Sequence, residues 1–139
     1  METERLVFRL WSQDLAPLAE KLWADKDVMF YLMPAHNVTP ENARARLQKE
    51  IESQLKCGIS YWPVFEKATD RFVGCCGLRP WVYTPDEATE MGFHLMPDMW
   101  GKGYATEAAI AVRNLAQERG IKLLIAGRHH ENRGSHHEP

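Results

Sequence analysis

The feature that most constrains the fold of this chain is a glycine-spaced turn that leads into an alanine-rich helix. Residues 99–109 read MWGKGYATEAA, with two glycines just before the run of small residues. Apolar residues then recur at helical spacing, which predicts an amphipathic helix over about 105–119 that ends at Gly120. Because a strand-like segment precedes the turn, the sequence predicts a strand, a turn and a helix in succession.

The start of such a helix suits an anion. Its first N–H groups lack carbonyl partners, and the aligned peptide dipoles leave a partial positive charge there. Gly101 and Gly103 carry no β-carbon and can take positive φ, while Lys102 adds a cation. The glycine patterns of triphosphate and dinucleotide sites do not occur in the sequence. We interpret the turn as a cradle for pyrophosphate; the alternative is that the glycines only shape a tight turn.

Length and composition favour one globular domain over residues 1–139. The chain has 139 residues, of which 45% are hydrophobic, enough for a single core. A formal charge of -2 gives no basic footprint for nucleic acid. Since the N-terminus lacks the apolar core of a signal peptide and the apolar runs are short, we expect a cytoplasmic protein with neither nucleic-acid nor membrane partners.

The cysteines fit reduced thiols better than a disulfide framework. Cys57, Cys75 and Cys76 are an odd set in which two are adjacent. The adjacent pair lies in an apolar, strand-like run, where small buried thiols are common. A catalytic cysteine is the less favoured alternative.

The order of predicted elements indicates an α/β domain of the mixed-sheet, α+β kind. Ser12 is a predicted N-cap for a first helix, and Thr39 for a second helix with Pro40 at its first position, ending before Gly58. Pro63 predicts an edge position or a bulge in its strand. The predicted strands are 6–10, 61–66, 72–78, 87–95 and 121–126, and the second and third form a hairpin.

Two titratable side chains share a face of the strand predicted over 87–95. On a regular strand Glu90, Gly92 and His94 point to one side, and Leu95 points to the other. Gly92 then leaves open space between the two titratable groups.

Three segments in order resemble a known family. Residues 89–108, TEMGFHLMPDMWGKGYATEA, resemble the central motif of the GCN5-related N-acetyltransferases (GNAT), especially the branch that acetylates the N-termini of ribosomal proteins. The superfamily loop reads Gln/Arg-x-x-Gly-x-Gly/Ala; here Trp100 takes the first position, in the Trp-Gly-x-Gly-Tyr-Ala form usual in that branch. Residues 3–10, TERLVFRL, resemble its first strand, and HEN-x-x-S at 130–135 resembles its Asn-x-x-Ser after the last predicted strand.

The resemblance implies the GNAT acyl-CoA N-acyltransferase fold and an acyltransferase activity. The reaction is direct transfer from acetyl-CoA to a primary amine, a protein N-terminus or a small amine, in a ternary complex without a metal. It implies pyrophosphate on the amides of 102–105, pantetheine in the gap between the last two strands, and the thioester carbonyl near the backbone of Leu95, where N–H groups stabilise a tetrahedral intermediate. The implied cofactor-binding residues are Leu95, Met96, Trp100, Gly101, Lys102, Gly103, Tyr104, Ala105, Thr106 and Asn132.

The resemblance also assigns two catalytic candidates. Glu90 matches the strand acid that acts as general base, through water, on the substrate ammonium. Ser135 is a candidate to hold or protonate the departing thiolate. The alternatives are a solvated strand carboxylate for Glu90, a cap serine for Ser135 and a turn residue for Asn132. We expect His94 to be a packed or exposed histidine rather than a catalytic one; the bulge common in this strand of the family, after about Phe93, would redirect it.

The sequence departs from the family pattern after Ser135. The family continues with a helix and two more strands, whereas this sequence stops at Pro139. We therefore expect a fold that lacks the final helix and strands, with a sheet edge that favours a homodimer or strand exchange. His129, His130, His136 and His137 lack a reliable ligand spacing, so we predict no metal site.

Three interpretations of function remain open at this stage. The favoured one is an active N-acetyltransferase. The others are an acyl-CoA-binding or interaction protein without turnover, and a generic anion site at the helix start. Loops 33–39 and 79–86 are expected to line the acceptor site, but their mixture of proline, aromatic and charged residues shows no specificity.

Overall fold

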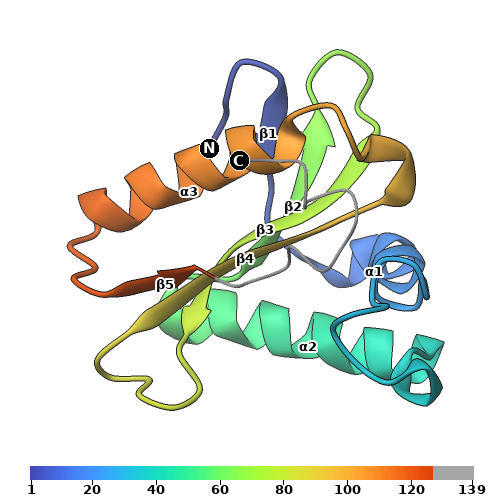
Figure 1. The fold of residues 1–139 in the computed structure, drawn as a ribbon, viewed down its shortest axis with the longest axis horizontal. Coiled ribbons are helices and arrows are strands. Elements are labelled where there is room, and N and C mark those ends of the chain that lie inside the picture. Colours follow the sequence, from blue (N-terminus) through green and yellow to red (C-terminus); the bar gives the residue numbers. More distant parts are fainter. Residues whose placement is uncertain (127–139) are drawn as a thin grey trace.

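The computed structural model describes residues 1–126, which form a five-stranded sheet with helices on both faces (Figure 1). In spatial order the strands are β1 (Leu6–Phe8), β2 (Tyr61–Glu66), β3 (Phe72–Pro80), β4 (Thr89–Leu95) and β5 (Leu124–Ala126). The first four are antiparallel neighbours, and β5 runs parallel to β4. The helices are α1 (Ala16–Trp23), α2 (Pro40–Cys57) and α3 (Tyr104–Glu118), with short 3-10 segments at Gln13–Leu15, Ala35–Asn37 and Pro97–Met99. The predicted mixed α/β fold is confirmed.

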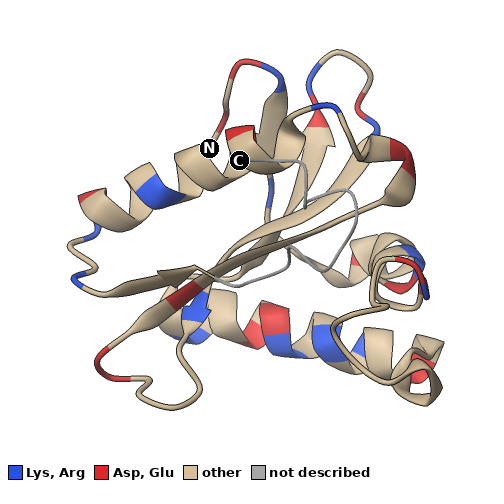
Figure 2. Ribbon diagram, in the orientation of Figure 1, with Lys and Arg blue, Asp and Glu red and all other residues tan. Residues whose placement is uncertain are grey.

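The two faces of the sheet carry different helices. Helices α1 and α2 pack against each other on one face, and α3, which connects β4 to β5, covers the other (Figure 1). Figure 2 shows that acidic and basic positions meet where β3 and β4 pass beside α2. Within the described residues no helix is long and apolar enough to cross a membrane.

Of the two predicted N-caps, one forms and the other does not. The Thr39 side chain accepts the N–H of Asn42 at 3.1 Å, Pro40 opens α2, and Gly58 closes it with φ 71°. That prediction is confirmed. The Ser12 cap is wrong, because its side chain makes no capping hydrogen bond and a 3-10 segment intervenes before α1.

Pro63 does not mark an edge strand. Strand β2 lies between β1 and β3, and Pro63 pairs with Cys75 of β3. Its carbonyl accepts the N–H of Arg9 at 2.9 Å, one residue beyond the end of β1. The N and C=O of a strand residue face the same side, so the nitrogen of Pro63, which carries no hydrogen, also faces β1. It lies where β1 ends, so no hydrogen bond of the sheet is lost there. The short first strand therefore tolerates a proline in an interior strand.

The irregularity of the sheet lies in the β2–β3 pair rather than in β4. Val64 pairs with Gly74 and Phe65 with Phe72, so β3 carries one extra residue between these pairs. The β3–β4 register, by contrast, runs without a shift from Leu95 to Thr89. The bulge considered for β4 after Phe93 is not found in this pairing, and strict alternation places Glu90, Gly92 and His94 together on the α1/α2 face.

Candidate functional site

The turn between β4 and α3 has the backbone expected of an anion cradle. Gly101 and Gly103 have φ of 77° and 78°, in the left-handed region that favours glycine. A Cβ on Gly101 would meet nothing within 4 Å, so the conformation and not space requires glycine there. Gly103 caps α3, and its carbonyl accepts the N–H of Glu107 at 3.1 Å. The N–H groups that open α3 therefore point out of the helix start.

Side chains around this turn form two ion pairs. Arg5 donates to the carbonyl of Lys102 at 2.9 Å and to the Glu107 carboxylate at 2.7 Å, with its guanidinium 4.5 Å from the Tyr104 ring centre. The ammonium of Lys102 lies 3.8 Å from Glu66, which also accepts the Tyr104 hydroxyl at 2.6 Å. Each of these two cations has a carboxylate partner. Sequence reasoning named Lys102 but missed Arg5, which belongs to the other end of the chain.

Hydrogen bonds keep both carboxylates ionised. Burial alone would raise the pKa of Glu107, but hydrogen bonds from Thr3 and Arg5 outweigh it and lower the pKa. Hydrogen bonds from Thr69 and Tyr104 lower the pKa of Glu66. The side-chain charges of the turn are therefore internally compensated near neutral pH, and the predicted anion site depends on its backbone.

The end of β4 presents one backbone N–H toward the β5 side. Met96 donates its N–H to Val73 of β3 at 2.9 Å, and Trp100 donates its indole N–H to the Leu95 carbonyl at 3.1 Å. Hydrogen-bonding direction alternates along an antiparallel strand, so the N–H of Leu95 points away from β3. The described pairing of β4 with β5 covers 89–91, and Leu95 lies beyond it. Leu95, whose backbone is expected near the thioester carbonyl, thus has a suitably directed N–H, whereas the N–H of Met96, an expected cofactor-binding residue, is used within the sheet.

Glu90 is buried and held by two donors. Its side chain accepts the Tyr61 hydroxyl at 2.7 Å and pairs with Nε of Arg79, its cross-strand neighbour. Glu90 is only 7% exposed, so the alternative of a solvated strand carboxylate is wrong. Both donors contact Oε1, and within residues 1–126 no hydrogen bond to Oε2 is found. One carboxylate oxygen is thus fixed, and the other is left to accept a proton.

The Tyr61 side chain contacts both titratable groups of β4. Gly77 of β3 pairs with Tyr61 on one side and with Gly92 on the other. At this point of the sheet neither β3 nor β4 therefore carries a side chain. The Tyr61 ring lies 5.7 Å from His94, and its hydroxyl reaches Glu90. Burial raises the pKa of the Tyr61 phenol well above its usual range, so the hydroxyl remains a donor. The two titratable groups of β4 are therefore separated by an aromatic ring.

His94 is a packed histidine. It is 4% exposed, and its Nδ1 accepts the indole N–H of Trp23 from α1 at 2.9 Å. An accepting Nδ1 carries no proton, which places the proton of the neutral ring on Nε2. His94 is therefore packed rather than exposed, and its non-catalytic role stays a prediction.

A buried ion pair on α2 completes this face of the site. Nε of Arg46 donates to Glu50 Oε2 at 2.6 Å, and Glu50 Oε1 accepts both the Ser60 hydroxyl and the Tyr61 N–H at 2.8 Å. The Arg46 guanidinium lies 5.0 Å and 5.1 Å from the ring centres of Trp23 and Tyr61. Sequence reasoning missed this pair. The signal that would have found it is a carboxylate at position 50 on the apolar stripe that contains Ala43 and Leu47, all three of which are buried.

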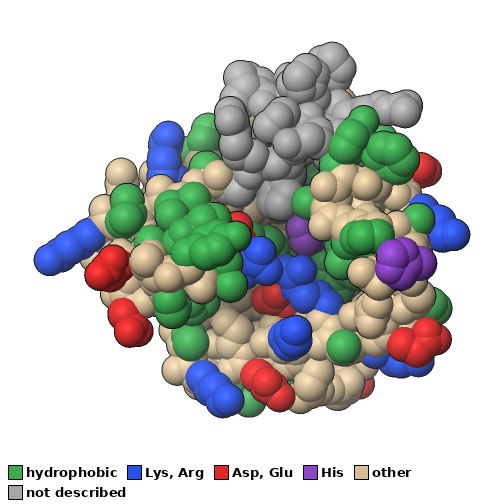
Figure 3. Space-filling view, turned by 60° about the horizontal axis from the view of Figure 1, so that its bottom comes forward, with side chains coloured by type: hydrophobic (Ala, Val, Ile, Leu, Met, Phe, Trp, Pro, Cys, Tyr) green, Lys and Arg blue, Asp and Glu red, His purple; other side chains and the backbone are tan. Residues whose placement is uncertain are grey.

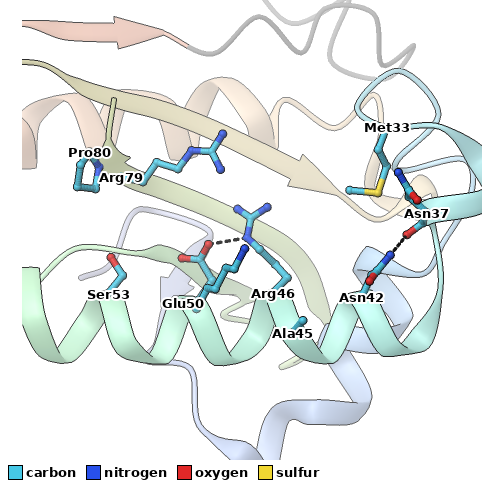
Figure 4. Close-up of a pocket in the computed structure, with 10 residues that line it drawn as sticks. Met33, Asn37, Asn42, Ala45, Arg46, Glu50, Ser53, Arg79 and Pro80 are labelled. Carbon is cyan, nitrogen blue, oxygen red and sulfur yellow. Dashed lines mark hydrogen bonds and ion pairs between the residues drawn. The ribbon is translucent and has the colours of Figure 1, made fainter. Parts of the chain in front are cut away.

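A cavity of about 640 Å³ opens beside this pair (Figure 4). Loops 33–39 and 79–86, expected to line the acceptor site, contribute at the rim, but α2 supplies most of the lining. The lining residues are Met33, Asn37, Asn42, Ala45, Arg46, Lys49, Glu50, Ser53, Arg79 and Pro80.

Several predicted candidates are not part of this geometry. Asn132, Ser135 and the four C-terminal histidines, at positions 129, 130, 136 and 137, lie outside the described residues. Among residues 1–126 no group of His, Cys, Asp and Glu could hold a metal ion. Cys75 and Cys76 are buried, and burial raises the pKa of the Cys75 thiol to about 12, so it remains protonated.

A comparison with protein families decides what kind of domain this is. The model of the acetyltransferase (GNAT) domain matches residues 5–137. The chain belongs to the GNAT acetyltransferase family.

Two curated proteins are similar to this chain in sequence. "Uncharacterized N-acetyltransferase p20" of Bacillus licheniformis is 30% identical over 110 residues, covering 76% of this chain and 59% of that protein. "Uncharacterized protein YkkB" of Bacillus subtilis (strain 168) is 31% identical over 110 residues, covering 78% of this chain and 63% of that protein. The GNAT chain thus spans about three fifths of the length of these relatives.

Solved structures confirm the GNAT fold. An acetyltransferase from Agrobacterium tumefaciens str. C58 superposes with a TM-score of 0.76 at 22% identity, covering 98% of this chain and 77% of that one. RimL, the ribosomal L7/L12 alpha-N-protein acetyltransferase, in complex with coenzyme A gives a TM-score of 0.73 at 16% identity, covering 96% and 78%. The resemblance to the branch that acts on ribosomal proteins therefore extends to the fold.

Proposed function

We propose that this GNAT chain transfers the acetyl group of acetyl-CoA to a primary amine, in a ternary complex. The observation that carries the proposal is that one strand, β4, presents Glu90 near one end and leads into the glycine turn at the other. The cofactor-binding element and the candidate base are therefore held by the same rigid element.

The β4–α3 turn is the proposed site for the pyrophosphate of acetyl-CoA. When bound, acetyl-CoA supplies the activated acetyl thioester. The N–H groups of residues 102–105 are the proposed donors, and the left-handed glycines remove the Cβ atoms that would stand in front of them. Arg5 and Lys102 lie beside this turn, but each is paired with a carboxylate, so the proposed binding depends on the backbone donors. Two GNAT structures of this fold support the choice: RimL with coenzyme A, and yncA from Salmonella typhimurium with acetyl-CoA.

Glu90 is the proposed general base. Tyr61 and Arg79 fix Oε1, and Oε2 accepts the proton of the substrate ammonium directly or through one water. The Leu95 N–H, directed toward the β5 side, is the proposed donor to the oxyanion that develops on the thioester carbonyl. As the C–N bond forms and the C–S bond breaks, the departing thiolate takes a proton. Ser135 stays a candidate for that step.

Calorimetric titration with acetyl-CoA tests the cofactor site, using two matched glycine variants. Gly103 and Gly120 both have left-handed φ, 78° and 74°, at opposite ends of α3. Gly103→Glu puts a carboxylate in front of the proposed phosphate donors and should abolish binding. Gly120→Glu imposes the same backbone strain and should leave affinity unchanged. Equal losses in both variants, or no binding by the parent chain, would contradict the proposal.

Thiol release in the presence of an amine tests turnover. Release that needs both acetyl-CoA and the amine supports the enzyme. Tight binding without such release would favour the alternative of an acyl-CoA-binding protein. The single domain over 1–139, the cytoplasmic location and the homodimer remain predictions.

A further inference from the structure

The cavity beside α2 contains more positive than negative charge. Arg46, Lys49 and Arg79 line it, whereas Glu50 is the one carboxylate among its described lining residues. Figure 3 shows basic side chains gathered at the centre of a hollow on this face. A cavity of about 640 Å³ is within the range that encloses a small molecule, and this charge favours an anionic one.

Within residues 1–126, both arginines keep N–H donors that no carboxylate uses. Arg46 contacts Glu50, and Arg79 contacts Glu90, in each case through Nε. Figure 4 shows both guanidinium groups directed into the space between α2 and β3. Nη2 of Arg46 is buried and has no hydrogen-bond partner in the described part of the chain. A buried donor without an acceptor is unusual in a folded protein, and a ligand oxygen would satisfy it.

Glu50 has no capacity left to neutralise the remaining cation. Its two oxygens already accept from Arg46, Ser60 and the Tyr61 N–H. Lys49 follows Arg46 by three residues on α2, so helical spacing places both side chains on the same edge of the helix. Lys49 is exposed and makes no ion pair within residues 1–126. Its ammonium therefore contributes uncompensated charge to the cavity.

One aromatic ring joins this charged cavity to the proposed base. The guanidinium groups of Arg46 and Arg79 lie 5.1 Å and 5.3 Å from the centre of the Tyr61 ring. The hydroxyl of the same tyrosine donates to Glu90 at 2.7 Å. A small molecule whose anionic group binds the guanidinium groups can therefore direct another group toward Glu90.

We propose that the acceptor is a small amine that carries a carboxylate, an amino acid or a close analogue. Its carboxylate binds Arg46, Lys49 and Arg79, and its amine faces Glu90. This inference rests on the acetyl transfer proposed above. The planar guanidinium matches a carboxylate through paired hydrogen bonds, and the same cations repel a polyamine. In the reaction the substrate ammonium loses one proton to Glu90 and the neutral amine forms the C–N bond. A second proton leaves the nitrogen for the departing thiolate as the C–S bond breaks, while the carboxylate is unchanged.

Three matched acceptors test the charge preference. γ-Aminobutyrate, n-butylamine and putrescine present the same aliphatic amine with an anionic, neutral or cationic far end, and glycine and β-alanine vary the spacing. We expect kcat/KM for the best amino acid to exceed that for n-butylamine by about tenfold or more, with putrescine lowest. Equal or better use of the neutral or cationic amine would overturn the inference.

Variants on α2 assign the preference to these residues. Lys49→Met and Arg46→Met should bring the ratio of kcat/KM between γ-aminobutyrate and n-butylamine toward one and leave acetyl-CoA affinity unchanged. Lys56→Met changes an exposed lysine on the same helix outside the cavity and should preserve the ratio. Because Arg46 is partly buried, its variant is the one at risk of misfolding, and exposed Lys49 then carries the test. A ratio that Lys49→Met leaves intact would overturn the assignment of this cavity.

The two proposals fail in different ways. Acetyl-CoA binding with turnover of an uncharged amine, or with no turnover of any amino acid, contradicts the inference about the acceptor. Absence of acetyl-CoA binding contradicts the proposed function itself.

Discussion

The glycine turn follows the end of β4, whereas the α2 cavity lies on the α1/α2 face of the sheet, and the two regions differ in how their charges are balanced. At the turn, Arg5 and Lys102 are paired with Glu107 and Glu66, and the proposed anion donors are backbone N–H groups. In the cavity the cations exceed the carboxylates among the described lining residues, and Nη2 of Arg46 has no partner within residues 1–126. The turn suits the pyrophosphate of the proposed cofactor, which is the same in every reaction. The cavity suits the charged group of the proposed acceptor, which differs from one amine to another.

The two proposals therefore assign backbone recognition of the cofactor to the turn and side-chain recognition of the acceptor to α2. A change of side chain at the turn alters recognition mainly if it changes the backbone conformation. A change of side chain on α2 alters the charge that an acceptor meets and leaves the turn as it is. The following variants test this separation.

Glu90→Gln should have the largest effect, and only on turnover. Glutamine can still accept from Tyr61 and Arg79, but it cannot take a proton, so amine-dependent thiol release should fall by roughly 10² to 10⁴. Acetyl-CoA affinity, measured by calorimetry, should not change. Glu118→Gln, at an exposed position on α3, is the matched control. Normal turnover in Glu90→Gln would exclude it as the base.

Glu50→Ala should destabilise the cavity side of the fold. Its removal leaves the Arg46 guanidinium and two further donors unpaired in a buried site, at a cost of about 3 to 5 kcal/mol in the free energy of unfolding. Urea titration measures this loss. Glu52→Ala, exposed on the same helix, should cost less than about 0.5 kcal/mol. Similar losses in the two variants would show that the buried pair is not a structural element.

Alanine substitutions of the two glycines in the turn distinguish the cost of backbone strain from the loss of acetyl-CoA binding. Gly101→Ala and Gly103→Ala should each lose about 1 to 2 kcal/mol of stability, because both residues have left-handed φ. Acetyl-CoA affinity should fall further in Gly103→Ala, since Gly103 caps α3 and its added Cβ would lie 3.4 Å from Arg5. Thermal unfolding and calorimetry on the same samples give both quantities. Unchanged stability in both variants would contradict the need for glycine.

Glu107→Gln should have the smallest effect, one that depends on pH. The pKa of Glu107 is lowered in the folded protein, so its stabilisation is fully present above the usual value of 4.5 and is lost as the pH falls through the folded value. We expect the variant to be less stable than the parent by about 1 kcal/mol near neutral pH, with the difference shrinking in acid. Urea titrations across this range measure it, and a difference independent of pH would contradict the assignment.

The elements that could be predicted from sequence are those with local causes. The Thr39 cap and the glycine turn depend on residues a few positions apart, and their conformations were anticipated. Tyr61 and Glu90 are 29 positions apart, and only the pairing of β2, β3 and β4 brings them together. The edge prediction for Pro63 failed because the local rule could not show that β1 ends beside it.

The lining of the cavity also could not be predicted from local sequence. Loops 33–39 and 79–86 were predicted to line the acceptor site, yet α2 supplies most of the lining of this cavity. Its charged residues read as an ordinary solvated helix face. The position of Glu50 on the apolar stripe was the one local signal, and the packing of α2 on the sheet is what distinguishes Arg46 from its exposed neighbours.

Because the cavity is lined mainly by one uninterrupted helix, its chemistry can change without rebuilding the sheet. The cavity residues of α2 recur every three or four positions along one edge, at Asn42, Ala45, Arg46, Lys49 and Ser53. Point substitutions along this edge would change the size and charge of the acceptor while the strands, the base and the glycine turn stay constant. For protein engineering, α2 is an exchangeable segment: a neutral or acidic edge grafted onto the same scaffold would redirect it toward neutral or cationic amines.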